Sequence, residues 1–376
     1  MKHKFDFVNS SLGKIRASNL YRKLQDSRVQ GPYITLNGKK LINLCSNDYL
    51  GLTTNQIIKR QLQSSSRLIA GNDFSFNVLE ERLAVHKSQE SALIFPTGYM
   101  ANLGAIATLA HKGDLILSDE LNHTSIIEAC KLSGASITVY RHNNTQDLQI
   151  KLKQKANRKF IVTEGIFSMD GDFACLDEIS SITSKTNAIL VLDDAHGDFV
   201  AGPDGMGSAK HFGVEKKIDV YVSSLSKALG AFGGYVASNK SIIDLTINTS
   251  RPFIYTSALP SFLVEFALKK FTSNREKRRN KLWKNIEMLR KGLKSIGYQI
   301  NSSTQIIPII IGSEKKALEF GRYLFESGVF AQPIRYPTVA TGKARIRISV
   351  TAWLSKDNID KSIDVFESAG KKFHIL

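Results

Sequence analysis

Short apolar runs that alternate with helical segments constrain the fold of this chain more than any other feature. Six runs rich in aliphatic and β-branched residues are predicted strands: 92–95, 115–118, 137–140, 160–163, 189–193 and 220–223. Most are nearly continuous in apolar residues, as expected for strands buried on both faces. Helical patterns, such as residues 100–110 and 176–185, lie between them. This alternation predicts an α/β domain with a mostly parallel sheet.

The two ends of the chain follow other patterns. An N-terminal helix and a hairpin at residues 33–43, with Asn37 and Gly38 in the turn, are expected first. After about residue 262, a charged helical segment precedes two apolar runs and two further helices, which predicts a smaller α+β domain. Its expected elements are a helix at 261–296, strands at 306–311 and 345–350, and helices at 315–327 and 357–369. We therefore expect an N-terminal arm at 1–45, a large domain at 46–262 and a C-terminal domain at 263–376.

The chain is strongly basic, with 51 Lys and Arg against 34 Asp and Glu and a formal net charge of +17. In a nucleic-acid-binding protein these residues should cluster on a motif with interleaved aromatics. Here they are spread along the chain, so no nucleic-acid partner is expected. A positive potential would instead favour encounter with an acidic substrate, such as a coenzyme A ester or an acidic carrier protein.

No segment indicates a membrane or an export pathway. The chain lacks a run of ~20 uncharged apolar residues that could span a bilayer. The N-terminus lacks the apolar segment of a secretory signal, so a cytoplasmic protein is expected. Cys45, Cys130 and Cys175 show neither CxxC nor metal-ligand spacing, and we expect buried thiols and no metal site.

Residues with catalytic potential follow the predicted strands. Asp193 and His196 end one aliphatic run, and Lys227 lies in a Ser- and Gly-rich turn after another. A lysine flanked by small residues directly after an apolar strand is unusual as a solvated charge. Desolvation would lower its pKa and make the neutral amine available for a Schiff base. Pyridoxal phosphate needs such a lysine for its aldehyde and a carboxylate to keep its ring nitrogen protonated.

A phosphate site is expected where another predicted strand meets a helix. Thr97, Gly98 and Tyr99 precede the helical pattern, and backbone amides at a helix N-terminus suit a phosphate group. Ser224 and Ser226 offer hydroxyls to the same group. Taken alone, Thr97, Gly98 and Tyr99 could equally form an ordinary helix cap.

Two further positions leave alternatives open. His123 follows the run at 115–118 and could cap a helix or stack on a cofactor ring. Arg345 and Arg347 fall on one face of a predicted strand because they are two residues apart. One of them could bind a substrate carboxylate bidentately, or both could be surface arginines on an edge strand.

From about residue 15 to residue 370, the chain resembles the α-oxoamine synthases, which are fold-type-I pyridoxal-phosphate enzymes. The motifs that carry the resemblance occur in order: SNDYLGL (46–52), SRLIAG (66–71), TGYMAN (97–102), NHTS (122–125), TEGIFSMDGD (163–172), DDAHG (193–197), SLSKALG (224–230), SRPFIYTSALP (250–260) and RYPTVATGKARIRISVTA (335–352). The likeness is greatest to the branch that condenses L-alanine with a pimeloyl thioester to give 8-amino-7-oxononanoate in biotin biosynthesis. The glycine C-acetyltransferase, 5-aminolevulinate synthase and serine palmitoyltransferase branches stay open.

The resemblance implies a role for each cofactor residue. Lys227 would form the Schiff base and shuttle the α-proton, and Asp193 would pair with the ring nitrogen. His196 would reach the phenolic oxygen of the ring. His123 would stack on the ring, and Ser168 would lie near that oxygen and the acyl group.

The resemblance also implies substrate and partner contacts. Asn47 and Arg347 would hold the amino-acid carboxylate, and Arg22 would approach the acyl substrate, which arrives on coenzyme A or on a carrier protein. The family is homodimeric, so Thr256 and Ser257 would contact the phosphate from the partner subunit.

Three departures from the family pattern fall on the substrate side. The segment at 53–65 is shorter than in the family, Ser64 and Ser65 replace a glycine-rich sequence, and Asn77 replaces a histidine. The acyl chain length and the choice of alanine or glycine are therefore not assigned. Two alternatives of another class are an aminotransferase of the same fold, which needs neither FSMDGD nor PTVATGKAR, and a non-catalytic pyridoxal-phosphate-binding protein.

Overall fold

The computed structural model describes residues 13–21, 27–52 and 65–376. The packing of the backbone divides the chain into two compact units. Unit 1 comprises Met1–Ser46, Met169–Gly171 and Lys281–Leu376, and unit 2 comprises Asn47–Ser168 and Asp172–Asn280. Unit 1 thus draws on both ends of the chain. The division expected from the sequence, with boundaries after residues 45 and 262, stays a prediction.

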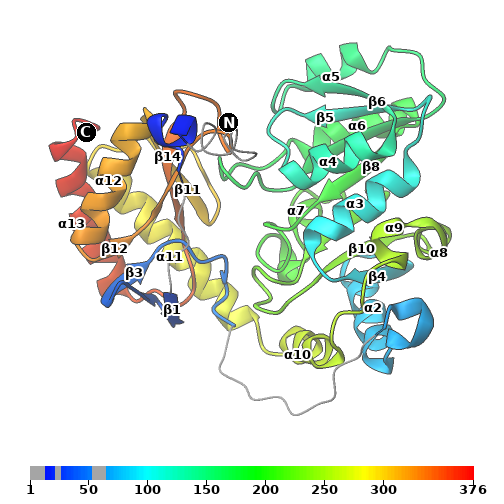
Figure 1. The fold of residues 1–376 in the computed structure, drawn as a ribbon, viewed down its shortest axis with the longest axis horizontal. Helices are drawn as coiled ribbons and strands as arrows, with labels where there is room; N and C mark the ends of the chain where they lie inside the picture. The colour runs from blue at the N-terminus through cyan, green and yellow to red at the C-terminus, as the bar shows by residue number, and fades with distance from the viewer. Residues whose placement is uncertain (1–12, 22–26, 53–64) are drawn as a thin grey trace, which may run out of the picture. The chain divides into compact units, whose positions relative to one another are not determined.

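Unit 2 is built on a seven-stranded sheet in the order β4-β10-β9-β8-β7-β5-β6 (Figure 1). The strands are β4 Ser91–Phe95, β5 Leu115–Asp119, β6 Ser136–Tyr140, β7 Lys159–Glu164, β8 Ile189–Asp193, β9 Val220–Ser224 and β10 Gly234–Ser238. Strands β5 to β9 pair in parallel, whereas β10 is antiparallel to both β4 and β9. All six predicted strands and the mostly parallel α/β fold are confirmed. Strand β10 was not predicted.

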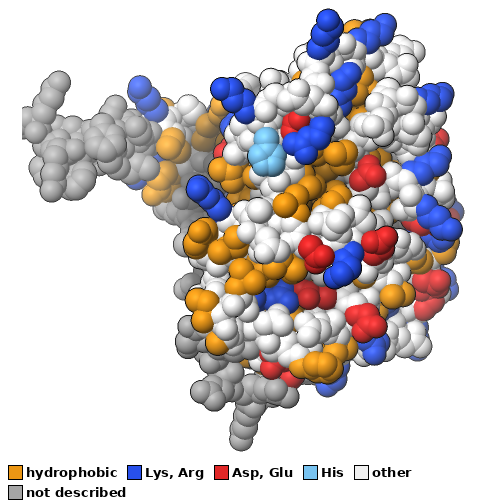
Figure 2. Space-filling model, turned by 90° about the vertical axis from the view of Figure 1, so that its right-hand side faces the viewer, with side chains coloured by type: hydrophobic (Ala, Val, Ile, Leu, Met, Phe, Trp, Pro, Cys, Tyr) orange, Lys and Arg blue, Asp and Glu red, His pale blue; other side chains and the backbone are white. Residues whose placement is uncertain are grey.

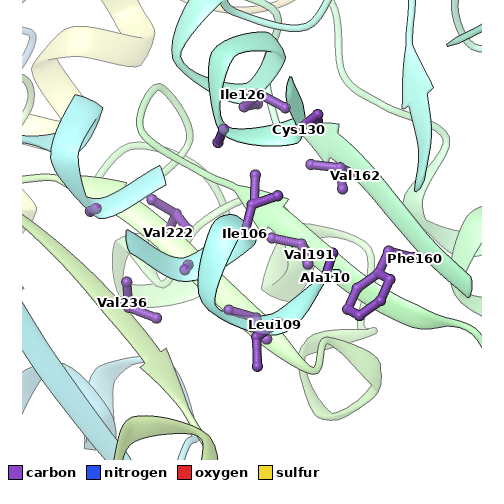
Figure 3. Close-up of a cluster of buried hydrophobic side chains, with 14 of the residues drawn as sticks. Ile106, Leu109, Ala110, Ile126, Cys130, Phe160, Val162, Val191, Val222 and Val236 are labelled. Atoms are coloured by element: carbon purple, nitrogen blue, oxygen red, sulfur yellow. The ribbon is translucent and has the colours of Figure 1, made fainter. Parts of the chain in front are cut away.

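Helices α3 (Gly98–Leu109) and α4 (Thr124–Ser133) cover one face of this sheet. Ile106 and Ile126 from these helices belong to the same buried cluster as Val191 and Val222 from the strands (Figure 3). The other helices of unit 2 are α2 Phe74–His86, α5 Thr145–Lys151, α6 Leu176–Thr186, α7 Ser208–His211, α8 Lys240–Thr249, α9 Arg251–Ile254 and α10 Ser261–Phe271, with a π-helical turn at Arg67–Gly71.

The apolar layer under α3 continues into polar residues at the carboxyl ends of the strands. Side chains alternate between the two faces of a strand, so residues two apart share a face. Asp193 therefore follows Val191 on the face that α3 covers, and Ser224 follows Val222. The same packing that buries the apolar residues thus directs these polar side chains toward the end of α3.

The prediction of one helix over 261–296 is wrong, because α10 ends at Phe271 and α11 (Glu276–Ser295) begins a few residues later. The Thr272 hydroxyl donates to the Leu268 carbonyl at 3.2 Å, and the Ser273 hydroxyl donates to the Lys270 carbonyl at 2.7 Å. These side chains satisfy carbonyls in the last turn of α10, which favours ending the helix there.

Unit 1 contains two small sheets and three long helices among its described residues. One sheet has the order β1-β2-β3-β12 (Ser27–Gln30, Tyr33–Leu36, Lys39–Asn43, Val329–Phe330) and the other has β11-β14-β13 (Ile306–Gly312, Ala344–Ser349, Gln332–Ile334). The predicted hairpin is β2–β3, and Asn37 and Gly38 in its turn have positive φ angles of 49° and 75°. The three long helices are α12 (Glu314–Glu326), α13 (Lys356–Lys372) and the part of α11 from Lys281 onward.

The surface carries charges of both signs. On the face in Figure 2, Lys and Arg side chains are scattered among acidic and apolar ones. This agrees with the even spread of basic residues along the sequence. Among the described residues, no helix has both the length and the apolar character needed to cross a bilayer.

Candidate active site

A cavity of about 220 Å³ in unit 2 lies where β7, β8 and β9 end. The cavity brings together predicted residues that follow β8 and β9 with predicted residues at the starts of α3 and α4. It is lined by Thr97, Gly98, Tyr99, Asn102, His123, Ser125, Glu164, Asp193, Ala195, His196, Ser224, Ser226 and Lys227. Ser168, Thr256 and Ser257 are not among the lining residues.

The Asp193 carboxylate is held by two hydrogen bonds. Its Oδ1 accepts from the Ala195 amide at 2.9 Å, and its Oδ2 accepts from Asn102 Nδ2 at 2.6 Å. Asn102 Nδ2 also donates to Ser125 Oγ at 2.9 Å, which ties Asp193 to both α3 and α4. The buried Asn102 Oδ1 finds no hydrogen-bond partner among the described residues.

Lys227 begins a chain of hydrogen bonds along the cavity wall. Lys227 Nζ lies 2.9 Å from His196 Nε2, and His196 Nδ1 lies 2.8 Å from the Tyr49 hydroxyl. The Tyr49 hydroxyl donates to Asn47 Oδ1 at 3.0 Å. Because this hydroxyl has a single proton, His196 Nδ1 is the donor to Tyr49 and Nε2 is the acceptor from Lys227.

The N-terminus of α3 lies at one end of the cavity, where its backbone amides are suited to an anion. Thr97 caps the helix by accepting from the Met100 amide at 3.1 Å, so the first amides of α3 face the cavity edge. Ser224 Oγ and Ser226 Oγ lie 2.8 Å apart beside it. A Cβ atom on Gly98 would come within 3.1 Å of the Ser224 Cβ. The glycine therefore allows the helix end to approach the serine hydroxyls closely.

Replacing Gly234 by alanine is expected to weaken binding of pyridoxal phosphate. The new Cβ would lie 2.4 Å from the Gly98 amide nitrogen and would displace the start of α3. Overpacking of this kind costs about 1–3 kcal/mol, so the Kd should rise by roughly 5- to 150-fold if the cost falls on the binding site. A fluorescence or absorbance titration measures it. Gly13→Ala is the control because, apart from its chain neighbours, no atom of the described residues lies within 4 Å of its Cβ position. Equal affinities of the two variants would contradict this prediction.

Glu164 and Asn102 are site residues that the sequence did not predict. Glu164 is buried, and its Oε1 accepts from the His123 amide at 2.6 Å. Burial raises the pKa of Glu164 to about 8, and the charge of Asp193 adds to the effect. The only signals were that Glu164 ends an apolar run and that Asn102 stands one helical turn after Gly98.

His123 takes one of the two roles that the sequence left open, the helix cap, and its stacking on a cofactor ring stays a prediction. Its Nδ1 lies 2.8 Å from Ser125 Oγ and accepts from the Ser125 amide, so the ring caps α4. The same ring lines the cavity. Burial lowers the pKa of His123, with Asp193 opposing and Lys227 adding to the shift. A neutral ring is therefore favoured at this position.

His142 joins two acidic residues in unit 2. Its Nδ1 lies 2.9 Å from Asp119 Oδ1 and its Nε2 lies 2.8 Å from Asp172 Oδ2, at the end of the FSMDGD motif. Burial disfavours the charged ring, but the hydrogen bonds to the two carboxylates outweigh it and raise the pKa of His142 to about 10. The charged imidazole therefore links Asp172 to Asp119, the last residue of β5.

This arrangement predicts a pH-dependent contribution to stability. The pKa of His142 in the folded state, about 10, exceeds its ordinary value of 6.5, so the contribution is complete below pH 6.5 and is lost as the pH rises toward 10. His142→Asn should lower the free energy of unfolding by about 2 kcal/mol at the acidic end of this range. Urea unfolding of both proteins across the range measures the difference, which should shrink with rising pH. A difference independent of pH would be inconsistent with a charged bridge.

The two arginines considered for binding a substrate carboxylate lie on β14 in unit 1. Arg345 and Arg347 are 6% and 9% exposed on the middle strand β14, so the alternative of surface arginines on an edge strand is wrong. Arg345 Nη1 lies 2.6 Å from Asp170 Oδ1, and Arg347 Nη1 donates to Ser349 Oγ at 2.8 Å.

Several other predicted residues are not among those that line the cavity. Asn47 belongs to unit 2, whereas Arg347 belongs to unit 1. Asn77 is exposed on α2. Thr256 and Ser257 are half-buried and exposed after α9, and their contact with a partner subunit stays a prediction. Arg22 and most of the shortened segment 53–65 lie outside the described residues.

Comparison with known proteins identifies relatives over the whole chain. The family model for class I and II aminotransferases matches residues 39–366. An 8-amino-7-oxononanoate synthase of Thermoanaerobacter pseudethanolicus is 41% identical over 100% of this chain and 99% of its own. A serine palmitoyltransferase from S. paucimobilis superposes with a TM-score of 0.92 at 28% identity, covering 99% of both chains. An 8-amino-7-oxononanoate synthase from Francisella tularensis has a TM-score of 0.77 at 27% identity and covers 89% of this chain and 99% of its own.

The cavity fits the cofactor of this family. It offers a lysine amine, a fixed carboxylate and a helix N-terminus with adjacent hydroxyls. These groups match the aldehyde, the ring nitrogen and the phosphate of pyridoxal phosphate. The chain therefore belongs to the class I and II aminotransferase family and, within it, to the α-oxoamine synthases, and it is a pyridoxal-phosphate-dependent acyltransferase of fold type I.

Proposed function

We propose that this protein condenses L-alanine with a pimeloyl thioester and releases carbon dioxide, giving 8-amino-7-oxononanoate for biotin synthesis. The observation that carries the proposal is the full-length match, at 41% identity, to a protein of that activity. The cavity around Lys227 and Asp193 supports it, because both groups are needed to activate an amino acid at its α-carbon.

The residues of the cavity have distinct proposed tasks. When bound, pyridoxal phosphate supplies an aldehyde that captures amines and a ring that accepts the electron pair left at the α-carbon. Lys227 would bind the aldehyde first and, once displaced by alanine, move the α-proton. Asp193 would keep a proton on the ring nitrogen. His123 would cover the ring face, and His196 would contact its phenolic oxygen.

Other residues would orient the substrates. The α3 amides with Ser224 would bind the phosphate, and Ser168 would lie near the acyl group. Asn47 and Arg347 would hold the alanine carboxylate, because a guanidinium can bind a carboxylate with two parallel hydrogen bonds. Arg22 is proposed to approach the acyl chain.

The proposed reaction balances with one proton from the solvent. A bond forms between the α-carbon of alanine and the thioester carbonyl carbon, and the carbon–sulfur bond breaks to release a thiolate, which takes up this proton to give the thiol. The bond from the α-carbon to the carboxylate then breaks and releases carbon dioxide. The proton that Lys227 took from the α-carbon returns to it, and the aminoketone is released.

We also propose a homodimer of a cytoplasmic protein, in which Thr256 and Ser257 contact the phosphate bound to the partner subunit. The thioester is carried by coenzyme A or by a carrier protein. The net charge of +17 supports either acidic donor, because a positive potential increases the rate of encounter.

A substrate panel tests the proposal. Release of free thiol would be measured with L-alanine, glycine or L-serine, each combined with pimeloyl-, acetyl- or palmitoyl-coenzyme A and with a pimeloyl carrier protein. Serine and the palmitoyl group are included because of the likeness to serine palmitoyltransferase. The proposal predicts the highest kcat/KM for alanine with a pimeloyl donor. A preference for another pair would assign the chain to another branch of the family.

A further inference from the structure

A buried ionic cluster lies on the far side of the sheet from the α3 core. Lys87, directly after α2, places its Nζ 3.0 Å from Asp194 Oδ2 and 2.7 Å from Asp198 Oδ1. All three side chains are fully buried, with 0% exposure. Nζ also donates to the Met206 carbonyl at 3.0 Å. The mechanism above uses none of these groups.

Asp198 extends the cluster to two strands and a second basic residue. Its Oδ2 accepts from Ser223 Oγ at 2.8 Å and from the Tyr235 hydroxyl at 2.5 Å, which connects it to β9 and β10. His86 Nε2 lies 2.9 Å from its Oδ1. The cluster therefore joins α2 to the ends of the strands that carry the active site.

The two carboxylates stand at the start and the end of a short turn. Between them lies His196, which reaches the cavity, and immediately before them lies Asp193, which also lines it. The turn is closed by the Gly197 and Asp198 amides, which donate to the Asp194 carbonyl at 3.0 and 2.7 Å. A single ammonium group thus ties both ends of the turn that presents Asp193 and His196.

The pKa directions support an ion pair between Lys87 and Asp198. Burial raises the pKa of Asp194, although the charge of Lys87 opposes this. Burial alone would lower the pKa of Lys87, but the charges of Asp194 and Asp198 outweigh it and raise that pKa. Burial also opposes ionisation of Asp198, yet Lys87 and His86 lower its pKa. A buried ion pair adds little stability compared with well-packed apolar residues. Its directional hydrogen bonds do, however, fix the positions of the backbone segments that it joins.

We propose that Lys87 is a positioning residue, which through Asp194 and Asp198 holds the 193–198 turn so that Asp193 and His196 face the cofactor. The proposal rests on the proposed function only for the identity of the amino acid. A misplacement of about 1 Å at a reacting group can reduce a rate roughly 10²-fold. The loss should therefore appear in a catalytic rate and not in substrate affinity.

The test is exchange of the α-hydrogen of the amino acid in deuterated water, followed by NMR. Exchange needs the cofactor site but no acyl donor, so the test remains informative if the pimeloyl assignment fails. The amino acid used would be whichever of alanine, glycine and serine undergoes exchange in the presence of the wild-type protein. Lys87→Met should lower kcat for exchange roughly 10²-fold while KM changes less than about threefold. The Kd for pyridoxal phosphate and the unfolding temperature of the cofactor-free protein would be measured alongside.

Arg158→Met is the control, because the half-exposed Arg158 pairs with the buried Asp114 at 2.7 Å before β5 and touches no residue of the turn. It should lower the unfolding temperature but retain exchange. Wild-type exchange by folded Lys87→Met, or an equal loss in both variants, would overturn the proposal. If Lys87→Met does not fold, Asp198→Asn replaces it in the test, because this change weakens the hold on one end of the turn and should also slow exchange. Unchanged exchange by folded Asp198→Asn would likewise overturn the proposal.

Discussion

Replacement of Lys227 by alanine is expected to abolish turnover while the protein remains folded. The Lys227 amine lies in the cavity wall, 2.9 Å from His196 Nε2, and is the group proposed to bind the cofactor and move the α-proton. Loss of proton transfer alone typically costs roughly 10²–10⁴-fold in rate, and loss of covalent capture adds to it. Thiol release from alanine and pimeloyl-coenzyme A measures the effect.

Lys240→Ala provides the control for this variant. Lys240 is an exposed lysine at the start of α8, 3.6 Å from Asp244, and it does not line the cavity. It should retain wild-type turnover. Circular dichroism and the unfolding temperature should show that both variants are folded. Normal turnover by folded Lys227→Ala would remove the basis for the assigned chemistry.

Asp193→Asn is expected to keep the cofactor bound but to lose most of the rate. The carboxylate is fixed by Ala195 and Asn102, and an amide in its place cannot stabilise a proton on the ring nitrogen. Loss of one preorganised electrostatic group costs roughly 10²–10³ in kcat. The α3 amides and the hydroxyls of Ser224 and Ser226 remain, so the phosphate should still bind. Cofactor content from visible absorbance and kcat from thiol release separate the two effects.

The matched control is Asp219→Asn, which also removes a carboxylate that accepts a backbone amide. Asp219 Oδ2 accepts from the Leu190 amide at 2.7 Å near the starts of β8 and β9, away from the cavity. Its kcat should be unchanged. An Asp193→Asn variant with the kcat of the control would show that the carboxylate does not assist the reaction.

The strands of unit 2 could be predicted because they are nearly continuous apolar runs. Strand β10 was missed because its five residues, Gly234–Ser238, follow a glycine-rich turn and include only two strong strand formers, Tyr235 and Val236. The helix over 261–296 was predicted too long because its charge pattern hides the break at Thr272 and Ser273. That break depends on hydroxyl contacts with the preceding turn.

Several residues that line the cavity could be predicted because a lysine, a carboxylate and a glycine each follow an apolar strand. Their contacts with the cofactor stay a prediction. Glu164 and Asn102 could not, because their roles depend on hydrogen bonds to residues far along the chain. The same holds for Lys87, whose partners Asp194 and Asp198 lie more than 100 residues away in sequence. Such partners are determined by tertiary packing and carry no local pattern.

The most direct test of the proposed chemistry uses L-alanine with an isotope label in its carboxyl group, pimeloyl-coenzyme A and the cofactor-loaded protein. Mass spectrometry would follow the labelled carbon, the free thiol and the organic product. The account predicts equal amounts of labelled carbon dioxide, free coenzyme A and 8-amino-7-oxononanoate. Retention of the label in pyruvate, without thiol release, would show an aminotransferase and contradict the account.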